Sequence, residues 1–482
     1  MSLSGALYNA FSGLKANSRA AGLVSTNISN ATTEGYGRRT LGLAPGAVGT
    51  TGGVRITGTV RHSDPVLTGD RMASDATLAH ATVGFEFASR IEDLVGESGT
   101  PGSLTDRVNA FENALLTASS NPASTQRLEL VANTADSLAR ALNGLSDEVQ
   151  SARQTADNRI AAQVETLNSA LSRLDSLNDN IVRAGSTGTD PTSFYDERQR
   201  VLDSIAEIVP LRVVEREKGD IAVFTRGGAV LLDGRPFEVG FEPNSAIGPG
   251  MTFANDDLSG LTLNGVPVDT QGMSMFAGGS LAAQFEIRDV DAVERQAQLD
   301  GIARDLIERL GPGGPDATLA ATDPGLFTDG GAAFAAVDET GIAGRIEING
   351  LVAPDSGGAW RLRDGLGAVT QGDVGDARLL QGISDALGAS SVPASGGLTA
   401  IARSFANHIS EFASSAVGER VRAENAQTFV SIQNTALSEL ELSKGVDTDQ
   451  ELQRLMQIEQ HYSANAKVMS TVDSLLERLM SI

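Results

Sequence analysis

The 482-residue sequence contains no cysteine, which excludes disulfide bonds, thiolate catalysis and zinc sites with cysteine ligands. Aromatic residues are scarce as well, at 4% of the chain against 41% hydrophobic residues in all. Cores must therefore be built from Leu, Ile, Val and Ala, a composition that suits long packed helices. A chain of this length exceeds the size of one core and is expected to form about three domains.

Basic residues are in short supply, since 37 Lys and Arg stand against 61 Asp and Glu, giving a net charge of -24. A nucleic-acid backbone and an anionic membrane surface both require a concentrated basic face, so neither is an expected partner. No segment approaches the ~20 consecutive apolar residues of a membrane span. The N-terminal residues lack the basic and apolar regions of a secretory signal peptide, so any export is expected to use a dedicated route without cleavage.

Patterns that would indicate catalysis or metal binding are weak. The four histidines are His62, His80, His408 and His461. None of them has the spacing of a shared metal site. Residues 382–386 resemble a nucleophile elbow but lack its second glycine and the preceding strand. Asp447-Thr448-Asp449 lacks the glycine and distal glutamate of a calcium loop and is better interpreted as a helix cap. We predict no catalytic residue, no metal, no cofactor and no enzymatic activity.

The N-terminal half of the chain has mainly helical periodicity. A helix is predicted over the first 34 residues, ending near Gly35-Tyr36-Gly37, and an extended segment follows near residues 36–65 with a loop at 46–53 and a short strand at 54–56. Helices are predicted next at 66–95, from Ser103 onwards, at 128–183 and at 194–209. Ser103 and Asp106 have the spacing of a capping box.

The middle of the chain changes character. Short β-prone runs separated by glycine pairs begin at residue 211, and Asn264-Gly265 predicts a type I′ hairpin turn. One helix at 292–310 interrupts these runs, a Gly/Pro-rich stretch follows it, and a further strand is predicted at 345–348. Helices return near residue 376 and continue from 398 to 442.

This order predicts an α+β multidomain fold, in which a discontinuous helical rod built from both chain ends carries an inserted β-rich domain. We assign residues 1–35 and 449–482 to a terminal helical domain. Residues 36–210 and 376–448 form the rod domain, and residues 211–375 form the inserted outer domain.

Both chain ends carry apolar residues at alternating steps of three and four, the pattern of a coiled-coil seam. The proposed assembly interface comprises Leu3, Leu7, Leu14, Asn17, Val24 and Ile28 at one end and Leu455, Ile458, Tyr462, Asn465, Met469, Val472, Leu476 and Leu479 at the other. Two amphipathic helices on an ordinary core would show the same periodicity equally well. The single Asn in each seam either sets register or lies at a wet edge.

The first helix is expected to be marginal by itself. Gly5, Gly13 and Gly22 each cost it about 1 kcal/mol relative to alanine. We therefore expect the terminal segment to be largely disordered in the monomer and to fold against partner copies. Arg38-Arg39, just past this helix, either binds an acidic patch on a neighbour or is a solvated pair, and the solvated pair is favoured.

Both ends resemble one known family. The motifs at residues 7, 10, 12–14, 16, 23, 27–28, 30–32, 35–36, 53–54, 60–61, 64–65, 67 and 71 are similar to the N-terminal signature of bacterial flagellar rod, hook and hook-associated axial proteins. Those at 445–447, 451, 455, 462, 464–468, 473, 476 and 479 are similar to its C-terminal signature. Further motifs resemble the helical rod of the hook-associated members, and they lie at 103–105, 111–115, 120–122, 127, 177–178, 195–198, 279–281 and 288–289. Among them, the stretch 195–198 resembles an acidic turn of that rod.

The resemblance implies a structural subunit at the junction between hook and filament, in a hollow assembly lined by the terminal helices. The implied partners are copies of itself in a ring, the hook protein, a second junction protein and, before export, a cytoplasmic chaperone on the C-terminal helix. The implied location is extracellular, reached through the flagellar type III route. A hook or distal rod subunit is the alternative within the family. An enzyme in the region 211–394, such as a cell-wall hydrolase or protease, and an adhesin-like protein are the alternatives outside it.

Overall fold

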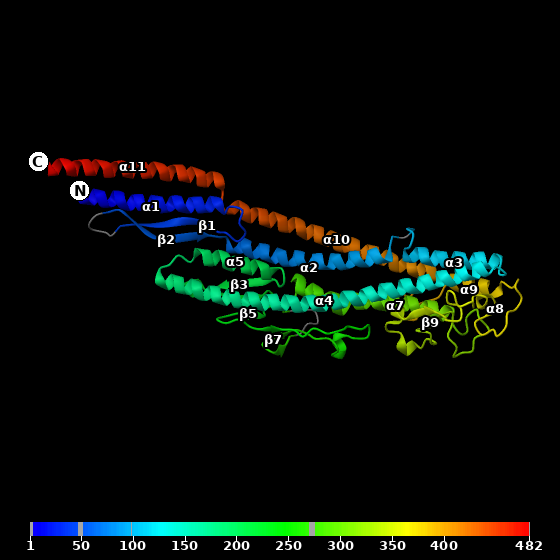
Figure 1. Cartoon of the computed structure of the whole chain (residues 1–482). Coiled ribbons are helices and arrows are strands. Elements are labelled where there is room, and N and C mark those ends of the chain that lie inside the picture. Colours follow the sequence, from blue (N-terminus) through cyan, green and yellow to red (C-terminus); the bar gives the residue numbers. More distant parts are fainter. Residues whose placement is uncertain (1–2, 47–51, 98, 269–274, 482) are drawn as a thin grey trace.

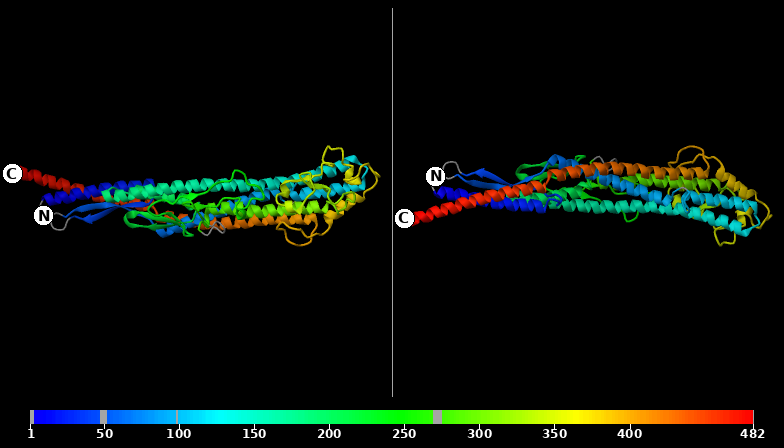
Figure 2. Two further views of the ribbon diagram at one scale, coloured as in Figure 1. Left: turned by 90° about the horizontal axis from the view of Figure 1, so that it is seen from below. Right: turned by 90° about the horizontal axis from the view of Figure 1, so that it is seen from above.

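The computed structural model describes residues 3–46, 52–97, 99–268 and 275–481. Long helices lie side by side in an elongated rod, and both chain ends lie at the same end of it (Figure 1, Figure 2). The rod helices are α2 (Pro65–Val95), α3 (Leu104–Ser120), α4 (Thr125–Thr187) and α10 (Phe405–Lys444), and the terminal helices are α1 (Leu3–Ser29) and α11 (Thr448–Met480). The predicted fold class, helices from both chain ends with small sheets between them, is confirmed.

Helix α4 runs along most of the rod. Its leucines at 138, 142 and 145 and Val149 follow steps of three and four and are all buried, so one stripe of the helix faces the rod interior. The helix ends at Gly188, which adopts a left-handed φ of 73° and donates its N–H to the Ala184 carbonyl. The predicted helical range 128–183 is thus one 63-residue helix.

Side-chain caps set where several helices begin. Ser103 Oγ accepts the Asp106 N–H at 3.2 Å and starts α3, as the capping spacing predicted. Asp447 caps α11 by accepting the N–H groups of residues 449 and 450, which confirms its interpretation as a cap. Ser404 caps α10 in the same way, so this helix begins at Phe405 and the predicted start at 398 was wrong.

The first helix is shorter than predicted. It ends at Ser29, and Asn30 bonds through its side-chain amide to the Thr26 carbonyl at 2.8 Å while the chain turns. The extended segment after it is an antiparallel hairpin of β1 (Arg38–Pro45) and β2 (Val54–His62). The sequence predicted only residues 54–56 as strand, because Gly42 and Gly58, which face each other across the hairpin, obscure the pattern. Most of the predicted loop at 46–53 lies outside the described residues.

Helix α5 (Thr192–Ala206) and two small sheets form the next part of the chain. The first sheet has the order β3 (Leu211–Glu215), β4 (Ile221–Thr225), β5 (Val230–Leu232). The second has the order β6 (Val239–Gly240), β7 (Thr262–Leu263), β8 (Val266–Pro267). Asn264 and Gly265 have φ values of 50° and 77°, which confirms the predicted type I′ turn between β7 and β8.

Helices α6 (Gly279–Glu286) and α7 (Ala292–Arg309), joined by a π-helical turn at Ile287–Asp291, return alongside α4 (Figure 1). They lie within the range 211–375, so that range is not β-rich throughout. At the π turn the Arg288 and Asp157 side chains are fully buried and form an ion pair of 2.7 Å. The buried Arg153 donates to the carbonyls of Arg288 and Met251, which ties the irregular segment around residue 250 to the rod.

The same turn holds a carboxyl group with an unusual pKa. Burial, aided by the charges of Glu286 and Glu294, raises the pKa of Asp291 from 3.8 to about 6 against the opposing effect of Arg295 and His80. The folded chain therefore holds this proton more tightly than the unfolded chain. The free energy of unfolding should fall by about 2.5 kcal/mol on this account as pH rises from about 4 to 7. Asp291→Asn removes this penalty, so urea titrations should show the variant gaining stability over the wild type across that window.

The matched control for this experiment is the exposed Asp147 on α4. Asp147→Asn should differ from the wild type by the same small amount at pH 4 and pH 7. Parallel pH dependence of the Asp291→Asn variant and the wild type would contradict the assignment.

The far end of the rod carries a turn-rich segment. Among described residues it contains β9 (Phe327–Asp329), its antiparallel partner β10 (Ile346–Ile348), and helices α8 (Arg361–Asp364) and α9 (Arg378–Gly388). Short 3₁₀ turns lie in this segment at Ala336–Asp338 and Ile342–Gly344. Two others lie earlier in the chain, at Glu217–Gly219 between β3 and β4 and at Phe253–Asn255 between β6 and β7. One core unites this end with α3, α4, α7 and α10, and a second lies between α4, α5 and the first two sheets.

Candidate functional site

Helices α1 and α11 lie side by side and project from one end of the rod (Figure 1, Figure 2). They approach closely near Gly13, where an added Cβ would lie 2.7 Å from Nδ2 of Asn465. Because Gly13 has no side chain, the Asn465 side chain fits against α1 at this point. The single Asn of the C-terminal seam faces a glycine of α1.

The predicted interface residues divide into three groups by burial. Val24, Ile458 and Val472 are buried, and Leu3, Leu14, Asn17, Ile28, Leu455, Asn465 and Met469 are half-buried. Leu7, Tyr462, Leu476 and Leu479 are exposed. The structure therefore brings one side of each seam into the α1–α11 pair and leaves the other residues at the surface.

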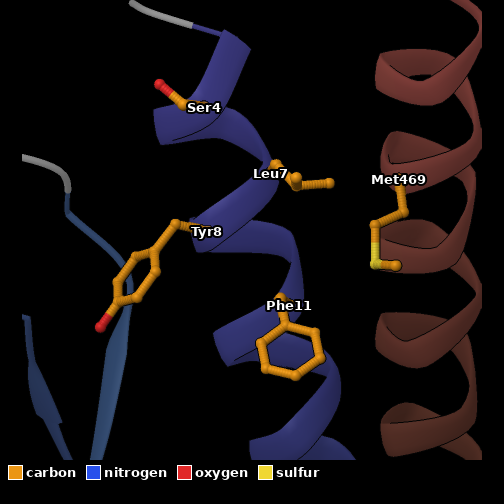
Figure 3. Close-up of a pocket in the computed structure, with 5 residues that line it drawn as sticks. All are labelled: Ser4, Leu7, Tyr8, Phe11 and Met469. Atoms are coloured by element: carbon orange, nitrogen blue, oxygen red, sulfur yellow. The ribbon is translucent and has the colours of Figure 1, made fainter. Parts of the chain in front are cut away.

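A shallow apolar groove of 390 Å³ runs between the outer parts of these helices, lined by Ser4, Leu7, Tyr8, Phe11 and Met469. Leu7 points toward Met469, Tyr8 points toward the hairpin, and the Phe11 ring lies in front of α1 (Figure 3). Tyr8 and Phe11 are 57% and 59% exposed. The sequence interpretation missed both, because they lie beside the seam; their own three-residue spacing next to Leu7 was the available signal.

Where the terminal helices meet the rod, buried polar groups form a joint. Asn27 is fully buried and donates to the Arg39 carbonyl at 2.8 Å and to Glu451 at 3.1 Å. Its oxygen accepts from the Tyr36 hydroxyl at 2.8 Å and from the Arg39 N–H at 3.0 Å. All hydrogen-bonding positions of this amide are used, so it fixes the end of α1 to both the hairpin and α11.

Glu451 is the second centre of the joint. Its side chain is 1% exposed and accepts from Arg38 Nε at 2.7 Å as well as from Asn27. Burial raises the pKa of the neighbouring Tyr36 hydroxyl, which keeps it protonated as a donor. Hydrogen bonds to a buried carboxylate are stronger than neutral ones, so this contact joins the two chain ends firmly.

Asp196 of α5 binds the hairpin from the rod side. It accepts from Arg61 Nε at 2.8 Å and from the Gly37 N–H at 3.0 Å, and it pairs with Arg39. The favoured interpretation of Arg38-Arg39 as a solvated pair was wrong, because acidic residues of the same chain bind both side chains. The acidic stretch at 195–198 lies inside helix α5 rather than in a turn.

A second ion-pair cluster lies next to this joint. Arg71 of α2 contacts Asp75 on its own helix, Asp203 of α5 and Glu441 of α10. Lys444 at the end of α10 binds Asp64 at 2.9 Å, and the side-chain bond lowers the pKa of that carboxyl group. Together the two clusters hold the rod helices at the point where the terminal helices leave them.

The histidines do not converge. His80 lies near Glu286 and the buried His408 near the Ser391 carbonyl, whereas His62 contacts Thr40. Within the described ranges no group of three or more His, Cys, Asp or Glu side chains is arranged to hold a metal ion. None of the described helices is long and apolar enough to cross a membrane.

Known proteins match this chain over both the rod and its C-terminal end. The family described as "Flagellar hook-associated protein FlgK helical domain" matches residues 88–311, and "Flagellar basal body rod FlgEFG protein C-terminal" matches residues 442–482. These matches define the chain as a flagellar axial protein. Over nearly its whole length it is similar to flagellar hook-associated protein 1.

The curated relatives share this family name. The flagellar hook-associated protein 1 of Bacillus subtilis is 22% identical over 97% of this chain and 96% of its own length. That of Escherichia coli is 26% identical over 48% of this chain, but the match spans only 44% of the relative. A solved structure of the flagellar hook junction protein FlgK from Burkholderia pseudomallei aligns with a TM-score of 0.45 and 18% identity over 55% of this chain and 47% of that one.

Proposed function

We propose that this protein is a structural subunit of the bacterial flagellum that forms the junction between hook and filament. The match to flagellar hook-associated protein 1 of Bacillus subtilis carries the proposal, because it extends over 97% of this chain and 96% of the relative and so includes both terminal helices. The structure adds a physical reason for assembly. Helices α1 and α11 project from one end of the rod with apolar side chains exposed, a surface that another copy can cover.

The interface residues have two roles in this proposal. Val24, Ile458 and Val472 hold α1 against α11 within one chain. The exposed Leu7 and Leu479, with the groove between the helices, contact other copies. The pairing within one chain explains why the seam periodicity suits both an ordinary core and an assembly interface.

The proposal includes the partners and location that the family resemblance implies. Copies of the chain form a short ring between the hook protein and a second junction protein, outside the cell. Export uses the flagellar type III route, and a cytoplasmic chaperone covers the C-terminal helix before export. The division into a terminal domain, a rod and an outer domain is part of the same proposal.

Electron microscopy of cells that lack the protein tests this function. We expect complete hooks on the cells and unattached filaments in the medium, with attachment restored by the full-length chain. Loss or truncation of the hooks themselves would favour a hook or distal rod subunit instead. Normal filaments on the deletion strain would overturn the proposal.

A further inference from the structure

One face of α10 changes character along its length. Near the far end of the rod its exposed residues include Asn407, Ser410 and Ser414, and the less exposed Val417 and Val421, at 37% and 38%, precede the exposed Asn425. Toward the terminal helices it becomes apolar over three turns. The apolar residues follow steps of three, four and four and are all exposed, and we call them the α10 stripe: Phe429, Ile432, Ala436 and Leu440.

The other face of this half-helix is occupied by α2 through polar contacts. Arg420 pairs with Glu92, and Gln427 donates to Thr82 at 3.1 Å. One and two heptads further on, Asn434 Nδ2 donates to Asp75 at 2.6 Å and Glu441 binds Arg71. An amphipathic helix of a monomer normally directs its apolar face inward, and here the outward face is the apolar one.

The stripe has the character of a contact surface. Its twelve helical residues span about 18 Å, and Phe429 and Ile432 are 69% and 66% exposed. Exposed polar residues, Gln433 and Glu439, flank it. Single exposed apolar residues are common on soluble proteins, but adjoining ones with a polar rim mark a site of association.

The position of the stripe indicates what covers it. α10 leads into α11 across Gly445. The exposed Leu452 and Met456, in the first turns of α11, come soon after Leu440 in the sequence. The stripe therefore adjoins the terminal helices at their end of the rod (Figure 1). If another copy packs along the terminal helices and the contact continues onto the rod, the stripe is the next surface that it reaches.

We propose that the α10 stripe is a second contact surface between copies of this chain, which adds a lateral rod contact to that of the terminal helices. This inference rests on the proposed function, because it requires a subunit that assembles with itself. It differs from the proposed function because the contact is made by the rod helix α10 and not by the terminal helices. A neighbouring copy buries Phe429 and Ile432 and leaves Ser410 and Ser414 exposed.

Charge substitutions in the full-length chain test the proposal in the bacterium that makes it. Phe429→Glu and Ile432→Glu should each lower the ratio of chain in purified flagella to chain free in the medium by about tenfold, which corresponds to about 1.4 kcal/mol of lost apolar burial. Ser410→Glu and Ser414→Glu, further along the exposed side of the same helix, should leave the ratio unchanged. Circular dichroism of the purified variants should match the wild type, because all four side chains are exposed.

Capture of the neighbour provides a second measurement. Because the sequence has no cysteine, Ile432→Cys carries a photoreactive maleimide at a single site. In purified flagella it should cross-link to a second copy of the chain, and Ser410→Cys should not. Capture of a different protein by the Cys at position 432 would overturn the proposal.

The remaining outcomes separate this inference from the proposed function. If a chain lacking residues 3–29 fails to incorporate but both stripe variants incorporate normally, the stripe proposal is wrong and the proposed function stands. If the chain lacking residues 3–29 incorporates normally, assembly through the terminal helices falls and the inference falls with it. Retention of the stripe variants inside the cell would also overturn the inference, because it would assign the stripe to a partner met before export.

Discussion

Asp157→Ala is expected to lower the free energy of unfolding by about 3–5 kcal/mol, the cost of leaving one partner of a buried ion pair uncompensated. Arg288 and Asp157 are both fully buried, and Asp157 also accepts the Asn244 N–H at 2.7 Å. The substitution leaves Arg288 charged near the buried Arg153, with Asp289 as its only remaining acidic contact in the described structure. Urea denaturation followed by circular dichroism measures the change.

The exposed Asp147, ten residues earlier on the same helix, provides the matched control. Asp147→Ala should change the free energy of unfolding by less than about 0.5 kcal/mol, as surface substitutions usually do. If the two variants differ by less than about 1 kcal/mol, the ion pair does not hold the π turn to the rod in the way described here.

Local patterns predicted the long helices well and the hairpin poorly. Helix α4 could be predicted because burial of one stripe imposes a period that is visible in any short window of sequence. Strand β1 could not, because its pairing with β2 and its contact with α1 depend on residues outside such a window. The buried Arg153 and Arg288 are a stronger case, since a charged residue gives no local sign that a partner more than 100 residues away will compensate it.

The candidate site could also be predicted from the sequence only in part. Seam periodicity predicted an apolar face on each terminal helix, and Val24 of α1 and Ile458 of α11 are buried. It could not tell which residues face the partner helix within the chain and which face outward. Asn27 and Glu451 stand in the signatures that identified the family, but the role of each as a joint residue follows only from the fold, which brings residues more than 400 positions apart into contact.

Glu451→Ala is expected to release the terminal helices from the rod without unfolding it. Glu451 is buried and binds both Arg38 and Asn27, and hydrogen bonds to a charged group contribute about 1.5–3 kcal/mol each. A loss of about 3 kcal/mol at the joint raises the opened fraction by about a hundredfold. Limited proteolysis near Gly445 should then accelerate strongly, because cleavage tracks the population of the open form.

The melting temperature of the rod should stay unchanged in this variant, because its cores lie away from the joint. Glu459→Ala, at an exposed position two turns further along α11, should be cleaved at the wild-type rate. The double variant Arg38→Ala/Glu451→Ala should lose less than the sum of the two single variants, since neither charge is then left without its partner. Equal cleavage of the Glu451→Ala and Glu459→Ala variants would show that the buried carboxylate does not hold the joint, and that packing of the α1–α11 pair against the hairpin fixes the terminal helices instead.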